Sequence, residues 1–381
     1  MAILKVQQRP SRRRVPSTSI IWAAITFTIV TIWYSVFPSN LDRVLKSPLK
    51  SAAAILPKDG PYLFFDEGRS YHDMNFTCPV AWEWTDDREK ADVVWDDVLG
   101  ARHSSAEELE KTRAYPGQLY AFYSLESGLN HPFVYEAKKT GYDFVVDYRI
   151  WPDHPEGMAD IPAVYLLNPT MPEFHVDFRA APQLPKRKDA YVAAFISNCG
   201  ARNNRSQVLK ELMEYLPVHS YGGCLHNIDE PEKGGLPRDN MLRNETLNLG
   251  GQYYFVFAPE NINEVSYVTE KVYKALAMGS VPIYFGAPDI DRFIPHPSSI
   301  IHANDFPTTL DLANYLKSLV ENEKAYEKLF EWKKKEFTED FNRILRLATR
   351  TVQCRLAMKL AGMDLEADQK DLHIFSLSKQ G

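Results

Sequence analysis

Short apolar runs separated by helical and polar segments dominate residues 61–180. Each run is too short for a helix and is bounded by polar or glycine positions, as buried strands are. These runs start at Pro61, Ala91, Gln118 and Tyr142. The segment that begins at Ser104 has helical spacing. Strands that alternate with helices predict a layered α/β domain with a largely parallel sheet.

A second α/β pattern covers residues 190–345. Residues 178–190 contain two prolines and a basic run, which predicts a linker between the two patterns. Beyond the linker, a helix is predicted at 205–216 and a strand–helix–strand unit at 253–286. Residues 346–381 are expected to form a C-terminal helix and tail. Two α/β halves of similar size predict a cleft between them.

The sequence FAPENINEVSYVTEK, from Phe257 to Lys271, lies where a predicted strand meets a predicted helix. Ligands of open α/β sheets bind beyond the carboxyl ends of the strands, and Glu260 and Asn261 lie at such an end. Thr269 is expected to cap the helix, its hydroxyl accepting a free backbone N–H. The start of a helix attracts anions, so Lys271 in the first turn suits an anionic ligand better than it suits stability alone.

Glu270 extends this nucleotide interpretation, because its carboxylate can accept hydrogen bonds from ribose hydroxyls. The alternative is a capped surface helix with a Glu270–Lys274 ion pair one turn apart. The sequence has no GxGxxG and no Walker A motif, which disfavours dinucleotide oxidoreductases and P-loop NTPases. The net charge of −6 gives no basic field of the kind that binds nucleic acid.

The N-terminal residues predict a membrane anchor. Residues 1–19 carry basic and no acidic side chains, and residues 20–37 carry no charge. That apolar run approaches the ~20 residues that cross a bilayer as a helix. Basic residues stay on the cytoplasmic side, so residues 1–19 form a cytoplasmic tail, and the stem at 38–60 leads to a lumenal body. The alternative is a cleaved secretory signal, whose apolar region is usually shorter and ends at small residues.

Sequons and cysteines fit a lumenal body. Asn-x-Ser/Thr triplets occur at Asn75, Asn204 and Asn244, and we expect glycosylation at Asn75 and Asn244. The four cysteines allow three pairings, and no Cys/His spacing indicates zinc. Asp289 and Asp291 resemble an acidic triplet that holds Mg²⁺, but we favour loop residues over a metal site.

The stretch from Phe257 to Pro282 resembles the donor-binding signature of the α1,3/4-fucosyltransferases, glycosyltransferase family 10. That family carries Phe-x-x-Glu-Asn, five residues, Tyr-x-Thr-Glu-Lys, and then a glycine and Val-Pro. The matching positions are Phe257, Glu260, Asn261, Tyr267, Thr269, Glu270, Lys271, Gly279, Val281 and Pro282. AAFISNCGARNNRSQVLKEL, HSYGGCLHN and GAPDIDRFIPHPSSI resemble the plant and invertebrate enzymes that fucosylate the N-glycan core. The resemblance is firm over residues 191–306, weaker over 115–148 and thin before that.

The resemblance implies a GT-B architecture of two facing Rossmann-like domains with a central cleft. Residues 61–180 would bind the acceptor and residues 190–345 would bind GDP-fucose. The implied reaction is inverting transfer of L-fucose, in α1,3 linkage, to the Asn-linked GlcNAc of N-glycans on glycoproteins. The implied location is the Golgi membrane, as a single-pass type II protein whose catalytic domain is lumenal. No cofactor is expected to be required, and Mg²⁺ or Mn²⁺ would give at most a non-essential stimulation.

Inversion needs a base for the acceptor hydroxyl and groups that stabilise the departing diphosphate. Lys271, the helix start and Arg205 fill the second role, because Arg205 matches the phosphate-contacting arginine of the family. Tyr267 is expected to lie against the guanine or ribose, with a buried core tyrosine as the alternative. The implied donor-binding set is Arg205, Glu260, Asn261, Tyr267, Thr269, Glu270 and Lys271, with Arg202 as the rival of Arg205 and Gly222 nearby.

The implied base is Glu126, in a Glu-Ser pair that follows an aromatic strand. Asp147 is its rival. Gly128 stands where enzymes that make Lewis-type linkages usually carry proline, which disfavours outer N-acetyllactosamine arms as acceptors. A Lewis-type transferase stays an alternative, as does a non-catalytic, membrane-tethered glycan-binding protein.

Cys199 and Cys224 each follow a predicted strand end, and parallel strands would bring them together as a disulfide. Gly222 next to Cys224 is expected to let the backbone approach the nucleotide, with a tight turn as the alternative.

Overall fold

The structure is a computed structural model that describes residues 58–66, 78–98, 105–165, 178–181, 183–229 and 244–366. All of these belong to one compact unit, Ile55–Gly381. The predicted cytoplasmic tail, membrane span, most of the stem and the sequon at Asn75 lie outside the described residues. Within the described ranges, no helix has the length and hydropathy needed to cross a membrane.

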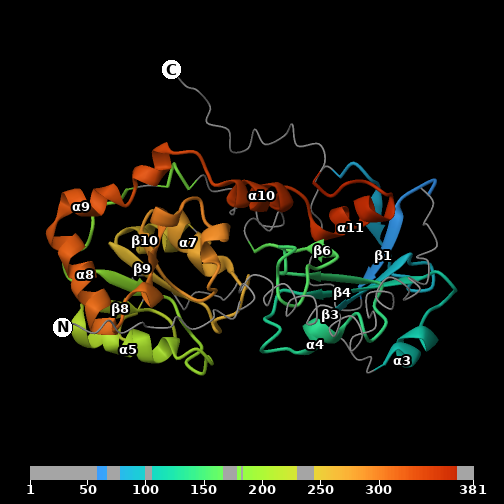
Figure 1. Ribbon diagram of the computed structural model, residues 1–381, viewed down its shortest axis with the longest axis horizontal. Coiled ribbons are helices and arrows are strands. Elements are labelled where there is room, and N and C mark those ends of the chain that lie inside the picture. The colour runs from blue at the N-terminus through green and yellow to red at the C-terminus, as the bar shows by residue number, and fades with distance from the viewer. Residues whose placement is uncertain are drawn as a thin grey trace, which may run out of the picture. The chain divides into compact units, whose positions relative to one another are not determined.

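The first half of the chain forms a parallel six-stranded sheet in the order β2-β1-β3-β4-β5-β6. Its strands are β1 (Tyr62–Asp66), β2 (Trp82–Trp84), β3 (Val93–Asp97), β4 (Leu119–Ser124), β5 (Phe144–Asp147) and β6 (Ile161–Pro162). Two short helices lie between strands, α3 (Ala106–Lys111) and α4 (Phe133–Glu136), as Figure 1 shows. The strands predicted from Ala91, Gln118 and Tyr142 are confirmed as β3, β4 and β5.

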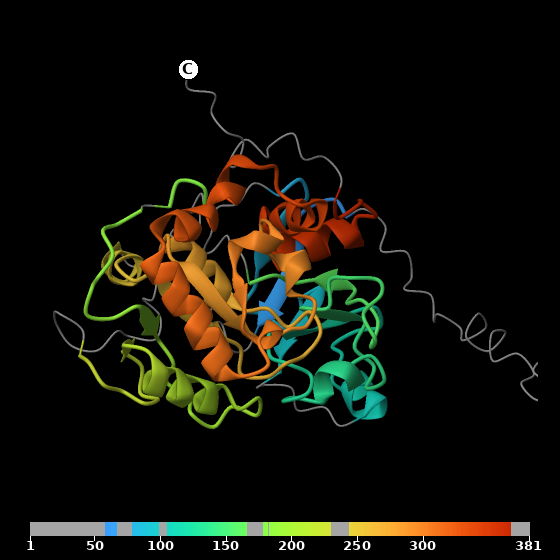
Figure 2. The same cartoon turned by 60° about the vertical axis from the view of Figure 1, so that its left-hand side comes forward.

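The second half forms a parallel five-stranded sheet in the order β11-β10-β9-β7-β8. Its strands are β7 (Val192–Ala194), β8 (Val218–Ser220), β9 (Phe255–Pro259), β10 (Val281–Phe285) and β11 (Ile301–His302). Its main helices are α5 (Arg205–Tyr215), α6 (Asn244–Gly251), α7 (Glu270–Ala277) and α8 (Thr309–Glu321). Helices α5 and α8 pack side by side, as Figure 2 shows. The predicted helix at 205–216 and the strand–helix–strand unit at 253–286 are confirmed.

Helix α7 packs against the two central strands of the second sheet because its apolar residues share one face. Val272, Ala275 and Leu276 are buried there. The helix ends at Ala277, and Gly279 just beyond it has a φ of 73°, a left-handed conformation that glycine adopts without strain. The start of α7 is thereby fixed beyond the carboxyl end of β9.

The amphipathic segment from residue 310 onward is divided among four helices. These are α8, α9 (Glu323–Lys328), α10 (Glu339–Ala348) and α11 (Val352–Leu360). Short 3₁₀ turns lie at η3 (Ile290–Phe293), η4 (Pro297–Ser299), η5 (Ala303–Asp305) and η6 (Glu331–Lys334). Helix α10 packs in an apolar cluster with α7 and η3 of the second half.

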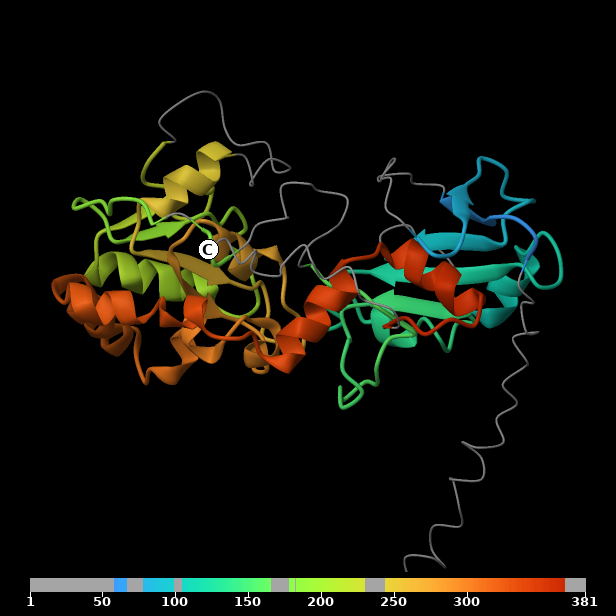
Figure 3. The same ribbon diagram turned by 90° about the horizontal axis from the view of Figure 1, so that it is seen from above.

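Helix α11 returns to the first half, where it packs near β2 and β6, as Figure 3 shows. Leu356, Ala357 and Leu360 belong to the same apolar cluster as Phe64 of β1 and Trp95 of β3. The first sheet is therefore covered by a helix that lies almost at the far end of the chain.

A disulfide joins Cys78, before β2, to Cys354 of α11, with their Cα atoms 5.7 Å apart. The two residues are 276 positions apart in the sequence, and the sequence alone left this pairing open. It fixes α11 covalently to the half that α11 covers.

We predict that Cys354→Ser lowers the free energy of unfolding by on the order of 3–5 kcal/mol, since the loop that the bond closes is long. Cys78→Ser should cost the same. Guanidinium denaturation under non-reducing conditions measures both. The double variant should be no less stable than either single variant, because one bond is lost in all three. Costs that add in the double variant would contradict this pairing.

Candidate active site

The site residues predicted from the sequence lie where parallel strands end. Glu126 follows β4, Arg205 follows β7 and its loop, and Glu260 follows β9 directly. The carboxyl ends of parallel strands lie along one edge of a sheet, which is the edge at which open α/β sheets bind ligands. Glu126 lies at this edge of the first sheet, and Arg205 and Glu260 lie at this edge of the second.

Glu260 has a fully buried carboxylate, with 0% of the residue exposed. Its Oε1 accepts a hydrogen bond from the Thr269 backbone N–H at 2.8 Å. Its Oε2 accepts from the Thr269 hydroxyl at 2.7 Å and from Lys271 Nζ at 3.2 Å. A buried charge is stable only when it is paired and hydrogen-bonded, and these three contacts meet that need. Contact between Glu260 and a donor stays a prediction, because protein donors reach both oxygens in this structure.

Thr269 is the N-cap residue of α7, as predicted, but its side chain does not act as predicted. Its hydroxyl donates to Glu260 and accepts from Lys271 Nζ at 2.6 Å, and it makes no capping bond to a helix amide. The buried carboxylate competes successfully for this hydroxyl because hydrogen bonds to charged groups are the stronger ones.

Lys271 lies between two carboxylates, 3.2 Å from Glu260 and 3.7 Å from Glu270. Burial alone would lower the pKa of Lys271, but the two carboxylates raise it above its ordinary value. Burial likewise opposes ionisation of Glu270, yet Lys271 and Lys274 lower the pKa of Glu270 to about 2. Lys274 Nζ lies 3.6 Å from Glu270, so the ion pair of the alternative interpretation also forms. Glu270 and Lys271 are therefore both charged at neutral pH.

Arg205 begins α5 and its side chain is buried. Nη2 donates to the Asn198 carbonyl at 2.9 Å and Nη1 donates to the Pro259 carbonyl at 3.3 Å. Burial lowers the pKa of Arg205, while the charge of Glu260 counteracts that shift. Among the described residues, no carboxylate lies within ion-pair distance of the guanidinium. Arg205 thus brings an uncompensated positive charge next to the start of α7.

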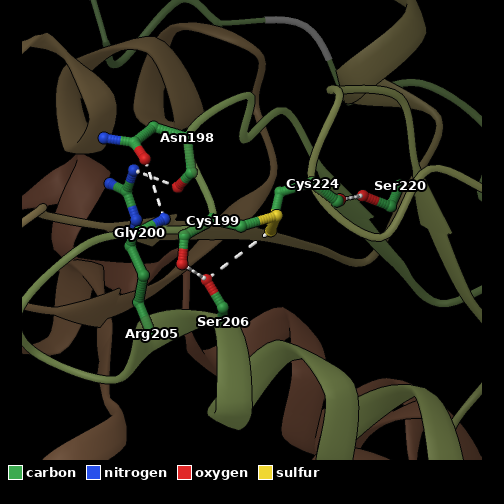
Figure 4. The surroundings of a disulfide bond; sticks show 7 residues. All are labelled: Asn198, Cys199, Gly200, Arg205, Ser206, Ser220 and Cys224. Atoms are coloured by element: carbon green, nitrogen blue, oxygen red, sulfur yellow. Dashed lines mark hydrogen bonds between the residues drawn. A yellow bond between two sulfur atoms is a disulfide. The ribbon is translucent and has the colours of Figure 1, made fainter.

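The loop that leads to Arg205 is fixed by a disulfide between Cys199 and Cys224, as predicted. Figure 4 shows this bond together with Asn198, Arg205 and Ser206. The Ser206 hydroxyl donates to the Cys199 carbonyl at 2.7 Å. The disulfide therefore ties the loop after β7 to the loop after β8. It also restrains the neighbouring Asn198, whose carbonyl accepts from Arg205.

Two polar atoms of this region are buried without a hydrogen-bond partner, Arg205 Nε and Asn261 Oδ1. Most buried polar groups in folded proteins are paired, so such exceptions are expected where a ligand supplies the missing partner. One is a donor and the other an acceptor, which suits a polar ligand that carries both kinds of group.

Three further predicted donor-site residues make contacts within the protein, and their contact with a donor stays a prediction. Arg202 is exposed, and its Nη1 donates to the Leu129 carbonyl of the first half at 2.9 Å. Tyr267 is buried and packs edge-on against Tyr148, with ring centroids 5.3 Å apart, as the core alternative anticipated. A Cβ added to Gly222 would lie 2.1 Å from the Ile196 carbonyl oxygen, so its close approach is to the backbone after β7.

Glu126 lies in the loop after β4 and is half-buried. Among the described residues, no hydrogen-bond partner or cation contacts its carboxylate. After the larger effect of burial, the charges of Glu126 and Glu270 both raise the pKa values of Tyr165 and Tyr267. The proposed base and the first residue of α7 are therefore near the same two tyrosines, one from each half.

The alternative acidic residues are engaged in the fold. Asp147 is fully buried, and Arg149 Nε and Nη2 donate to its carboxylate at 2.6–3.0 Å. Asp289 accepts from the backbone N–H and hydroxyl of Ser266 at 2.7 and 2.8 Å, which holds Ser266 at a left-handed φ of 62°. These contacts favour structural roles for both aspartates, as the loop interpretation of Asp289 anticipated.

Sequence reasoning missed three residues near Glu126, two of which, Tyr148 and Glu264, join the halves. They are Tyr148 after β5, Tyr165 after β6 and Glu264 before α7. Glu264 was visible as an acidic residue in the motif, but nothing in its spacing indicated a partner more than a hundred residues away.

Comparison with known proteins identifies the family of the second half. A model of the glycosyltransferase family 10 (fucosyltransferase) C-terminal domain matches residues 185–373. A fucosyltransferase-like protein of Arabidopsis thaliana is 33% identical over 258 residues, which cover 67% of this chain and 45% of that protein. Alpha-(1,3)-fucosyltransferase B of Drosophila melanogaster is 34% identical over 213 residues, which cover 55% of this chain and 47% of that protein.

A third relative differs in the acceptor that its name states. GDP-fucose protein O-fucosyltransferase 3 of Xenopus tropicalis is 37% identical over 148 residues, which cover 39% of this chain and 31% of that protein. The chain spans less than half the length of these three relatives. The family match confirms the resemblance read from Phe257 to Pro282.

The fold is also that of a solved fucosyltransferase. A crystal structure of an alpha1,3-fucosyltransferase superposes with a TM-score of 0.52 at 15% identity, covering 81% of this chain and 92% of that chain. At that identity the likeness concerns the fold alone. It confirms the α/β, GT-B class predicted from the sequence.

Replacing Glu270 by glutamine tests the charge cluster at the start of α7. The folded-state pKa of Glu270 lies below its unfolded value, so its stabilisation is complete above the unfolded pKa and is lost as the pH falls toward about 2. After allowance for solvent screening, we expect the wild type to be more stable than E270Q by on the order of 2 kcal/mol near neutral pH. The difference should shrink as the pH falls to about 3. Urea denaturation at several pH values measures it, and a difference independent of pH would contradict these ion pairs.

Proposed function

We propose, because residues 185–373 belong to glycosyltransferase family 10 (fucosyltransferase), that this chain transfers L-fucose from GDP-fucose, in α1,3 linkage, to the Asn-linked GlcNAc of N-glycans. The observation that carries the proposal is the arrangement at the start of α7. There a positively charged helix end, Lys271 and Arg205 adjoin polar atoms that have no partner among the residues that the structure describes.

The second half would hold the donor. Lys271 and the Arg205 guanidinium, whose Nε is unpaired, supply positive charge for the diphosphate, and the first amides of α7 supply hydrogen-bond donors. Glu270 would accept hydrogen bonds from hydroxyls of the ribose or of fucose. Glu260 would act indirectly, because its contacts with Thr269 and Lys271 set the position of the lysine.

The first half would supply the base. The bond between the anomeric carbon of fucose and the diphosphate oxygen breaks, and the acceptor oxygen bonds to that carbon from the opposite face. The proton of the acceptor hydroxyl passes to Glu126, and GDP leaves with the electron pair of the broken bond. Two observations support this role for Glu126. Its carboxylate has no hydrogen-bond partner in the part of the chain that the structure describes, and its charge, like that of Glu270, raises the pKa of the buried Tyr267.

Two observations support the core GlcNAc as acceptor. The sequences around Cys199, Cys224 and Asp289 resemble core-type enzymes. The Drosophila relative, by its name, supports the α1,3 linkage alone. The second observation is Gly128, which stands where Lewis-type enzymes usually carry proline. Its N–H donates to the Tyr148 hydroxyl at 2.9 Å, which proline cannot do, and an added Cβ would lie 2.2 Å from the Tyr135 ring.

The second candidate acceptor is a serine or threonine hydroxyl of a protein. The similarity to an O-fucosyltransferase of Xenopus tropicalis favours it, although that match covers only 39% of this chain. The donor side would be the same for both acceptors, and only the group that approaches Glu126 would differ.

We also propose that the enzyme is a single-pass type II protein of the Golgi membrane. The basic residues 1–19 and the uncharged residues 20–37 support this orientation. Metal is proposed to be dispensable, because Lys271 and Arg205 can stabilise the leaving diphosphate without it.

An acceptor assay tests the function. Full-length protein in detergent, supplied with GDP-fucose, should release GDP and fucosylate a GlcNAc-terminated N-glycopeptide, with or without EDTA. Mass spectrometry with linkage analysis should identify fucose α1,3-linked to the Asn-linked GlcNAc. Transfer to unglycosylated peptide hydroxyls would favour O-fucosylation, and transfer to N-acetyllactosamine would favour the Lewis-type enzyme. Glycan binding without any transfer would leave the non-catalytic alternative.

Two variants should separate donor binding from catalysis. We expect Lys271→Ala to weaken GDP binding about ten- to hundredfold, the value of a hydrogen bond to a charged group. Glu126→Gln should leave GDP binding unchanged and lower kcat by about 10²- to 10⁴-fold, the range of general base catalysis. Calorimetry with GDP and initial rates measure the two effects.

The matched controls are Lys111→Ala and Glu107→Gln, which remove the partners of an exposed ion pair on α3. Both should behave as the wild type, since exposed pairs contribute little. If Glu126→Gln retained the wild-type kcat, another group would have to be the base.

A further inference from the structure

Glu264 is a buried carboxylate whose hydrogen-bond donors all come from the other half of the chain. It lies between β9 and α7 in the second half, and only 6% of it is exposed. Its Oε1 accepts from the Tyr148 hydroxyl at 2.5 Å. Its Oε2 accepts from the Ser127 hydroxyl and from the Leu129 backbone N–H, the latter at 3.3 Å. Among the described residues, no cation lies within ion-pair distance of Glu264.

These donors belong to, or hold, the loop that directly follows Glu126. Ser127 is the next residue, and the Gly128 N–H donates to the Tyr148 hydroxyl, which in turn donates to Glu264. Glu264 thus contacts the loop directly through Ser127 and Leu129 and indirectly through Tyr148. Burial raises the pKa of Glu264, and the hydrogen bonds from the loop oppose that shift only in part.

Further contacts hold the backbone on both sides of Glu126. On one side, the Tyr165 hydroxyl donates to the Leu125 carbonyl at 2.6 Å. On the other side, Arg202 of the second half donates to the Leu129 carbonyl at 2.9 Å. The backbone of Leu129 is therefore bound on both sides: its N–H donates to Glu264, and its carbonyl accepts from Arg202. By contrast, none of these contacts uses the carboxylate of Glu126.

We propose that Glu264 is a positioning residue for the transfer reaction, which orients Glu126 by fixing the Ser127–Leu129 backbone against the donor-binding half. This inference rests on the proposed function. Arg202 supports the same peptide, which gives it a role other than phosphate binding. The geometry of the base is thus set by the half that holds GDP-fucose, and the distance from base to anomeric carbon depends on contacts between the halves.

The convergence of donors explains why a carboxylate occupies this position. An ionised carboxylate only accepts hydrogen bonds and offers about four lone-pair directions for the hydroxyl and amide donors that reach it. Glutamine has nearly the same shape, but its amide nitrogen would face one of these donors. The Tyr148 hydroxyl could reverse its role, so glutamine should retain part of the arrangement, and alanine should retain none.

The test compares Glu264→Ala, Glu264→Gln and a matched control, Asp143→Asn, in the full-length protein. Asp143 also accepts from a backbone N–H, that of Tyr120 at 2.8 Å, and pairs with Arg113 at 2.9 Å. It precedes β5 and so lies at the opposite, amino-terminal edge of the first sheet from Glu126. Its replacement should lower stability without moving the loop that carries the base.

We expect Glu264→Ala to lower kcat, calculated from the concentration of GDP-binding sites, by about 10²-fold. A displacement of about 1 Å in a reacting group lowers a rate by that factor. The KM for GDP-fucose and the Kd for GDP should change less than about twofold, because the donor contacts remain. The acidic limb of the pH–kcat profile, which reports the base, should shift. Glu264→Gln should lie between alanine and the wild type, and Asp143→Asn should match the wild type in all three measurements.

Amide hydrogen exchange gives a measurement that does not depend on activity. Gly128 and Leu129 should lose protection in Glu264→Ala and keep it in Asp143→Asn. If Glu264→Ala folds poorly, Glu264→Gln and Ser127→Ala replace it, with smaller losses of the same kind. Dividing each rate by the concentration of GDP-binding sites corrects for protein that is misfolded.

The outcomes separate failure of this inference from failure of the proposed function. A wild-type kcat and pH profile in Glu264→Ala, while the wild type transfers fucose, would overturn the positioning role alone. Unchanged exchange at Gly128 and Leu129 would do the same. A wild type that binds GDP but transfers fucose to no acceptor would overturn both.

Discussion

The buried carboxylate of Glu260 determines how the start of α7 is built. A charge without solvent contact must find donors nearby, and it takes them from the Thr269 backbone, the Thr269 hydroxyl and Lys271. The usual capping bond of the threonine is given up as a result. The same carboxylate holds Lys271 in the first turn of α7, where the helix dipole alone would disfavour a lysine. The position of the Lys271 ammonium group is therefore set by a residue that need not touch a ligand.

Much of the fold was predictable because its strands are buried and continuous in the sequence. The apolar runs at β3, β4, β5, β9 and β10 are typical of strands covered on both faces. The turn from β9 to α7 was predictable in position because Thr269 and Gly279 mark the two ends of the helix. Since strand ends share an edge, the ordering of these elements also predicted which residues would lie beside one another.

Contacts between the halves could not be predicted, because they depend on tertiary placement. Glu264 has no local signal for partners such as Ser127, and Cys78 could have paired with any of three other cysteines. The role of Thr269 that was wrong has a different origin. Local propensity identified the cap, and a buried charge just after β9 redirected its hydroxyl. In both cases the sequence did not show which side chains burial brings together.

The return of α11 to the first sheet has a consequence for synthesis of the chain. Phe64 and Trp95 are made early, yet the helix that covers their cluster, with Leu356 and Leu360, is made only after the whole second half. The first half therefore emerges with an uncovered apolar face and cannot complete its core until α11 has been made. Domains usually fold as units in the order of their synthesis, but here the half made first is the half completed last. During that interval the uncovered face is a surface that folding factors could bind.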